Sequence, residues 1–160
     1  MNKTMGLKPI TLNSKLNKKS IFLRILQEII TGLLIILWAY TGISKIMDHD
    51  ETLFNMARSP FIDKYALFLS WAVPIVELVL VVLLSLNKFR LIGYYISLFL
   101  LASFTIYIYA MLNYSYYLPC SCGGVLNKMT WQDHLYFNIG YTTLTITGIL
   151  ITGIKTNQKK

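Results

Sequence analysis

Four long apolar runs, separated by short polar intervals, dominate the chain. They cover about residues 25–43, 66–86, 91–112 and 134–154. Each run is close to the roughly 20 residues that an α-helix needs to cross about 30 Å of hydrocarbon. The pattern therefore predicts an all-α fold, an integral membrane bundle of four transmembrane helices.

The polar intervals divide the chain into one membrane domain and two tails. Residues 1–20 are polar and basic and predict a cytoplasmic tail, and residues 155–160 predict a second, shorter one. The membrane domain is then expected to span residues 21–154. Because only residues 87–90 separate the second and third runs, these two helices are expected to form an antiparallel hairpin.

The longest interval, between the first and second runs, contains the stretch "DHDETLFNMARS". Its acidic start and the proline that follows are typical of a short helix. We expect this helix to lie at the membrane surface, to begin near Asp48 or Asp50, and to end before Pro60.

Composition supports a membrane protein and argues against a nucleic-acid partner. Of the 160 residues, 55% are apolar and only 14% are charged, whereas soluble domains carry about 25% charged residues. The net charge is +8. The basic residues flank the apolar runs instead of lining one folded face, so we interpret them as topology signals. The expected partner is the lipid bilayer.

The distribution of Lys and Arg predicts the orientation of the bundle. Of the fifteen basic residues, eleven fall on the side of the N-terminus and four on the opposite side, the latter being Lys45, Arg58, Lys64 and Lys128. Cytoplasmic loops carry the excess of positive charge. Both termini are therefore expected inside the cell, and the interval between the third and fourth runs outside.

That outer interval contains the only two cysteines, Cys120 and Cys122, in the stretch "PCSCGG". A proline before them and two glycines after them favour a turn. A turn can bring two cysteines at i and i+2 within disulfide distance. A bridge that closes so small a ring gains little loop entropy, and exposed bridges exchange readily. The pattern predicts a redox pair on the oxidising, extracytoplasmic side.

Three other interpretations of the cysteines stay open. They could form an inert staple, or two free thiols, or two ligands of a metal completed by His134 and His49, although we expect no metal. In the redox interpretation, His134 at the start of the fourth run is a candidate for raising the thiolate fraction. Lys45, just past the first run, either extends toward the interface or lowers a thiol pKa.

Acidic residues also occur inside the apolar runs. Glu77 lies near the middle of the second run, where a carboxylate costs a few kcal/mol and normally faces the bundle. It is a candidate for proton handling or for contact with a buried headgroup or a quinone. Glu28 is placed to pair with Arg24 one turn earlier. The alternative for Glu77 is a hydrogen bond to a hydroxyl of another helix, with these candidates: Ser97, Ser103, Thr143 and Thr145.

Three stretches together resemble the MauE branch of the DoxX-like membrane proteins. They are "GLLIILWAYTGISKIMD", which contains Gly42 and Lys45, "VPIVELVLVVLLSL", which contains Pro74 and Glu77, and "PCSCGGVL". The resemblance covers about residues 25–154 and implies a four-helix membrane bundle. The paired cysteines are its most telling mark, because many DoxX-like proteins lack them.

The resemblance also implies a function. The named member of the branch is required for maturation of the small subunit of methylamine dehydrogenase, a periplasmic protein rich in disulfides. The resemblance thus implies a redox-associated role for Cys120 and Cys122. The composition, rich in Lys and Tyr, is typical of a low-GC bacterium, so we expect the bacterial inner membrane, with the cysteine pair on the periplasmic or extracytoplasmic side.

We therefore expect a membrane thiol–disulfide oxidoreductase that relays exchange with a thioredoxin-like or secreted client protein. The electron acceptor would be a quinone or a second redox protein, although no quinone motif is visible. Two alternatives are a non-catalytic assembly factor and a small transporter built on Glu77. A homo-oligomer also stays open.

Overall fold

The computed structural model describes residues 10–114 and 130–157, and within these ranges all regular structure is helical. The all-α prediction, a bundle of four long helices, is thus confirmed. The elements in chain order are α1 (Ile10–Met47), α2 (His49–Ala57), the 3-10 turn η1 (Asp63–Tyr65), α3 (Ala66–Ser85), α4 (Arg90–Tyr114) and α5 (Trp131–Asn157).

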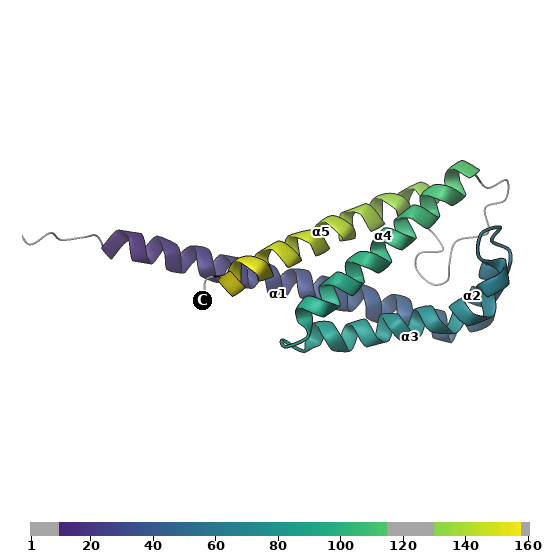
Figure 1. Cartoon of the computed structure of the whole chain (residues 1–160), viewed down its shortest axis with the longest axis horizontal. Coiled ribbons are helices and arrows are strands. Elements are labelled where there is room, and N and C mark those ends of the chain that lie inside the picture. The colour runs from purple at the N-terminus through teal and green to yellow at the C-terminus, as the bar shows by residue number, and fades with distance from the viewer. Residues whose placement is uncertain (1–9, 115–129, 158–160) are drawn as a thin grey trace, which may run out of the picture.

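The four long helices run antiparallel in chain order and form two closely packed pairs (Figure 1). The most extensive contacts join α1 to α3 and α4 to α5. The α3–α4 turn lies at one end of the bundle, which we call the hairpin end, together with the N-terminal part of α1 and the C-terminal part of α5. The opposite end, which we call the α2 end, carries α2, η1, the last turn of α4 and the first turn of α5 (Figure 1).

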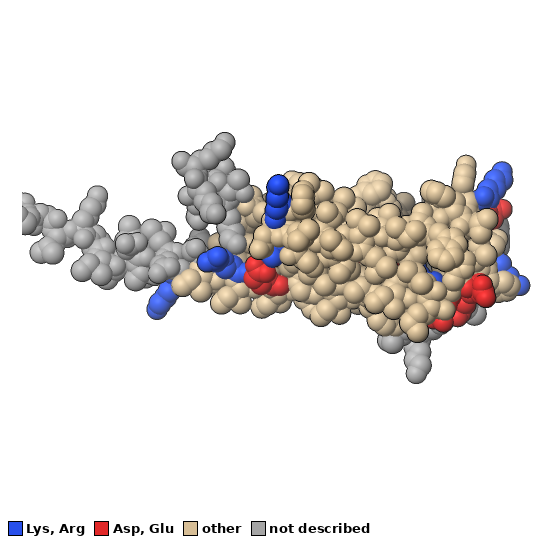
Figure 2. Space-filling model, turned by 90° about the horizontal axis from the view of Figure 1, so that it is seen from below, with Lys and Arg blue, Asp and Glu red and all other residues tan. Residues whose placement is uncertain are grey.

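Four helical segments in the described residues are long and apolar enough to cross a membrane, and they are Ile21–Met47, Asp63–Ser85, Arg90–Tyr114 and Trp131–Gly153. Figure 2 shows the acidic and basic side chains gathered toward the two ends of the visible face, with an uncharged band between them. Such a band matches the hydrocarbon layer of a bilayer. The chain is a multi-pass membrane protein.

Two segments outside the spans refine the sequence-based expectations. Helix α1 starts at Ile10, well inside the stretch expected to form a tail, and Figure 1 shows it projecting beyond the bundle at the hairpin end. The short helix expected after the first run is α2, which follows Asp48 and ends at Ala57, before Pro60. Proline cannot supply the N–H that a continued helix needs, which explains the stop.

The half of the bundle nearer the hairpin end holds most of the hydrophobic core. Large apolar side chains from all four long helices are buried there, among them Leu34, Leu84, Tyr94 and Ile151. Tyr94 lies against Gly148, where a Cβ atom would come within 2.6 Å of Tyr94 Cε1. A glycine at this position therefore allows the close approach of α4 and α5, as is common between helices in lipid.

Polar side chains in this half are joined in pairs between helices. Thr31 Oγ1 and Tyr94 OH lie 2.9 Å apart, and Trp38 Nε1 donates to Ser97 Oγ at 3.0 Å. Gln27 Nε2 donates to Thr152 Oγ1 at 2.9 Å. In a bilayer no water replaces a missing partner, so these pairs remove the cost of placing polar groups among apolar ones.

At the hairpin end an ion pair joins α1 to α4. Arg90 Nη1 lies 2.7 Å from Glu28 Oε1. The expected pairing of Glu28 with Arg24 on the same helix was therefore wrong. The close packing of α1 beside the start of α4 brings a cation from another helix within reach, and the Glu28 side chain still keeps 60% of its exposure.

Candidate functional site

The most unusual contact inside the bundle is an ion pair between α1 and α3. Lys45 Nζ lies 2.7 Å from Glu77 Oε1, and the exposed fractions of the two side chains are 16% and 1%. Of the two possibilities left open for Lys45, its extension toward the interface is not what the structure shows, and the partner of this Glu77 oxygen is an ammonium instead of one of the four hydroxyls named as candidates. A buried carboxylate in lipid gains more from a full opposite charge than from a neutral donor.

The local geometry of α1 explains why this pair forms. Side chains on a helix lean toward its N-terminus, so a lysine in the last turn of α1 is directed back into the bundle. One turn earlier, Gly42 lets α3 approach. A Cβ atom there would lie 3.2 Å from Leu78 side-chain atoms and 3.3 Å from Glu77 Cβ. Gly42, Lys45 and Glu77, which carried the family resemblance, thus lie together at one crossing of α1 and α3.

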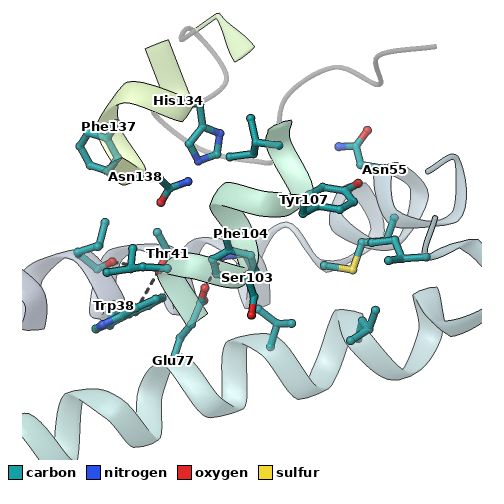
Figure 3. A pocket seen from close by; sticks show the side chains of 18 of the residues that line it. Trp38, Thr41, Asn55, Glu77, Ser103, Phe104, Tyr107, His134, Phe137 and Asn138 are labelled. Atoms are coloured by element: carbon teal, nitrogen blue, oxygen red, sulfur yellow. Dashed lines mark hydrogen bonds and ion pairs between the residues drawn. The ribbon is translucent and has the colours of Figure 1, made fainter. Parts of the chain in front are cut away.

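The pair forms part of the wall of a cavity of about 260 Å³ in the half of the bundle nearer the α2 end. All four long helices and α2 contribute to its lining (Figure 3). Most of the wall is aliphatic or aromatic, and the aromatic residues are Trp38, Tyr40, Phe104, Tyr107, Trp131 and Phe137. The cavity therefore offers an apolar space within the membrane-spanning part of the protein.

Three buried polar atoms on this wall have no hydrogen-bond partner among the described residues. They are Asn55 Nδ2 on α2, Glu77 Oε2 on α3 and Asn138 Nδ2 on α5. All three residues are buried, with Asn55 the most exposed at 8%. Figure 3 shows Asn138 and Glu77 on different walls of the cavity and Asn55 at its α2 side. Buried amides and carboxylates normally find partners, so this grouping marks the cavity as a candidate binding site.

His134 also lines the cavity, from the first turn of α5 (Figure 3). The start of α5 is fixed by a capping arrangement. The backbone N–H of Asp133 donates to Thr130 Oγ1 at 3.2 Å, and Thr130 Oγ1 donates in turn to Asp133 Oδ2 at 2.7 Å. Such a cap sets the direction of the first helical turn. His134, Lys45 and Glu77, three of the residues singled out from the sequence, are thus brought to one cavity.

The second histidine lies elsewhere. His49 Nε2 is 3.2 Å from Ser70 Oγ, and its ring packs at a tilt against Trp71 with 4.3 Å between ring centroids. It is not part of the cavity lining. In the described ranges, no three His, Cys, Asp or Glu side chains gather as they would around a metal ion. Cys120 and Cys122, the other proposed ligands, lie outside the described residues.

The redox prediction also falls on Cys120 and Cys122 and so lies outside the described part of the chain. The residues that border this segment are described. Tyr114 ends α4, Thr130 precedes α5, and both lie at the α2 end (Figure 1). This is the end nearer the cavity.

Asn55 and Asn138 were not singled out from the sequence. Asn138 had a usable signal, because an amide within an apolar run is rare and usually faces the bundle interior. Asn55 had no such signal. It lies in an amphipathic segment where a polar residue would ordinarily face water, and only the folding of α2 against α3 buries it.

Comparison with known proteins gives one clear result. No curated protein and no solved structure matches the chain. Residues 23–151, most of the sequence, match the family described as "Methylamine utilisation protein MauE". The match covers α3 and α4 completely, most of the membrane spans in α1 and α5, and the segment that contains both cysteines. The chain therefore belongs to the MauE family.

Proposed function

We propose that the protein relays thiol–disulfide exchange through Cys120 and Cys122 on the extracytoplasmic face of the bacterial inner membrane. The client would be a secreted or periplasmic protein of methylamine utilisation, or a thioredoxin-like partner that serves it. The observation that carries the proposal is the place of the cysteine segment in a MauE-family bundle. In the sequence it lies between α4 and α5, and the two helix ends that border it lie at the α2 end.

The charge distribution supports placing the α2 end outside the cell. The intervals at the hairpin end carry eleven of the fifteen basic residues. The α2 end instead carries five of the seven acidic residues, and they are Asp48, Asp50, Glu51, Asp63 and Asp133. An excess of Lys and Arg marks the cytoplasmic side. Both termini would then be cytoplasmic, and the cysteines would meet an oxidising environment.

The exchange reaction needs no group beyond two pairs of cysteines. A thiolate of the reduced protein attacks a sulfur of its partner's disulfide and forms a mixed disulfide. The second thiol of the attacking pair then displaces the partner's sulfur. One dithiol is oxidised to a disulfide, one disulfide is reduced to two thiols, and the protons are exchanged with solvent. Cys120 and Cys122 can act either as the dithiol that is oxidised or as the disulfide that is reduced.

Three residues of the cavity are proposed to support the exchange. Thiolate formation releases a proton and is favoured by a nearby cation or base. His134 lies four positions after Thr130, at the end of the bundle where the cysteine segment rejoins α5. The Lys45–Glu77 pair is proposed to exchange protons with this histidine across the cavity that all three residues line. These are positioning and proton-handling roles, and the sulfurs remain the reacting atoms.

Single cysteine variants test the exchange directly. In cells that carry Cys122→Ala or Cys120→Ala, one of the two variants should accumulate a mixed disulfide with a client, visible on a non-reducing gel and removed by reductant. Ser121→Ala, which lies between the two cysteines, is the matched control and should leave exchange intact. Full client maturation in the double alanine variant would refute the relay and leave a non-catalytic assembly role.

Labelling tests the orientation separately. After mild reduction, a membrane-impermeant maleimide added to intact spheroplasts should modify Cys120 and Cys122. The double alanine variant is the control for background labelling. Modification only after the membrane has been permeabilised would place the sulfurs on the cytoplasmic side and contradict the proposed topology.

A further inference from the structure

The cavity between the four long helices has the features of a binding site for a small neutral ring compound. We propose that it binds a lipid-soluble quinone, a flat apolar ring that carries two carbonyl oxygens. This inference goes beyond the proposed exchange and does not rest on it, because ring binding requires neither cysteine.

The size and lining of the cavity fit such a ring. Its volume is about 260 Å³, and a dry cavity of about 150 Å³ is enough to hold benzene. There is thus room for a substituted ring or for two fused rings. Aromatic side chains line several of its sides, including Trp38, Phe104 and Phe137 (Figure 3). Offset or edge-to-face contacts with these rings would favour a flat aromatic or quinonoid ligand over a flexible chain.

The unpartnered polar atoms select a ligand with oxygens. Asn55 Nδ2 and Asn138 Nδ2 are buried donors on α2 and α5, without a partner in the described part of the chain. Each matches a carbonyl acceptor. Glu77 Oε2 also has no partner in the described part of the chain. It is an acceptor to which a hydroxyl of the reduced ring could donate. A hydrocarbon in the same place would leave all three atoms unsatisfied, which is costly in a water-free environment.

The charges of the cavity argue against a lipid headgroup. Lys45 and Glu77 lie 2.7 Å apart, so their charges compensate each other. An anionic phosphate would have to compete with Glu77 for the ammonium, and a cationic headgroup with Lys45 for the carboxylate. Because the walls come largely from membrane-spanning segments, a ligand that dissolves in the bilayer can reach the site from there. A neutral ring with carbonyl groups dissolves in the bilayer and does not compete with either member of the ion pair.

A pair of rings that differ only in their oxygens tests the proposal. The full chain, purified in detergent, is titrated by calorimetry with 2,3-dimethyl-1,4-naphthoquinone and with 2,3-dimethylnaphthalene, and protein-free micelles serve as the blank. The two methyl groups block the ring positions at which thiols would add. The quinone should bind at least about tenfold more tightly, because it alone can accept from the two amides. Equal affinities, or no binding of the quinone, would overturn the proposal.

Substitutions then locate the site. Asn138→Leu keeps the approximate size of the side chain and should reduce the preference for the quinone severalfold, and Asn55→Leu should do the same. Asn87→Leu, the same change in the exposed turn at the hairpin end, is the matched control and should leave the preference unchanged. If neither cavity variant alters the preference, the ring binds elsewhere and the assignment fails. The comparison of the two rings on the unmodified protein stands even if a variant folds poorly.

Discussion

The two halves of the bundle differ in how completely their buried polar groups are paired. Near the hairpin end, polar side chains are joined in pairs between helices, such as Thr31 with Tyr94 and Trp38 with Ser97, within a filled core. Near the α2 end, a cavity opens and three buried polar atoms on its wall lack partners among the described residues. Arg90 Nε is the one such atom near the hairpin end.

This difference indicates where the bundle keeps polar groups for a purpose other than stability. A satisfied polar pair in lipid contributes to the fold, whereas an unsatisfied one lowers stability and persists where a ligand or a reaction uses it. The hairpin half therefore acts as the scaffold, and the α2 half holds the candidate site. Substitutions in the two halves should have effects of different size and, in one case, of opposite sign.

The largest effect is expected from breaking the Lys45–Glu77 pair. Glu77→Gln leaves a largely buried ammonium without its counter-charge, and removing one member of a buried pair typically costs about 3–5 kcal/mol. The double variant Lys45→Met/Glu77→Gln should be more stable than either single variant, Lys45→Met or Glu77→Gln, because no buried charge remains. Thermal unfolding of the four proteins in one detergent measures this. Additive losses in the double variant would show that the two charges do not interact.

The close contact of α4 with α5 should give the next largest effect. Gly148→Ala places a Cβ atom within 2.6 Å of Tyr94 Cε1, and overpacking of this kind costs about 1–3 kcal/mol. Gly140→Ala on the same helix is the control, since nothing lies within 4 Å of the added atom. Unfolding temperatures should fall for the first variant and stay level or rise for the second. Equal behaviour of the two variants would contradict the packing of Tyr94 on Gly148.

Two substitutions that each remove a polar side chain should change the stability of the protein in opposite directions. Asn138→Leu removes from the cavity wall an amide whose Nδ2 has no partner among the described residues, and should stabilise the protein by about 1 kcal/mol. Ser97→Ala leaves Trp38 Nε1 without its acceptor and should destabilise the protein by about 0.5–1 kcal/mol. Ser85→Ala, whose hydroxyl bonds only its own helix, is the control. Destabilisation by Asn138→Leu would weaken the contrast between the halves.

The smallest effect is expected at the hairpin end itself. Glu28→Gln removes the ion pair with Arg90, but the Glu28 side chain is 60% exposed. Exposed pairs contribute about 0–1 kcal/mol and are screened by salt. The difference in unfolding temperature between wild type and variant should be small at low salt and vanish at high salt. A large, salt-independent loss would mean that this end is not a solvated surface.

The sequence was sufficient for the architecture because each membrane span needs its own continuous apolar run. It was also sufficient to single out Glu77, since a carboxylate inside such a run is costly wherever it points. It could not identify the partner. Lys45 lies 32 positions earlier, and its direction depends on how closely α1 and α3 approach at Gly42. The cavity could not be foreseen either, because it is a space left between helices and corresponds to no local sequence pattern.

The ion pair between α1 and α3 also bears on how the protein enters the membrane during synthesis. Glu77 lies eleven residues into α3, about 16 Å along its axis, where a lone carboxylate is expensive to insert. Lys45 precedes it in the chain and has already left the ribosome when α3 emerges. The first two spans can therefore neutralise each other as they leave the translocon, before α4 and α5 have entered the membrane.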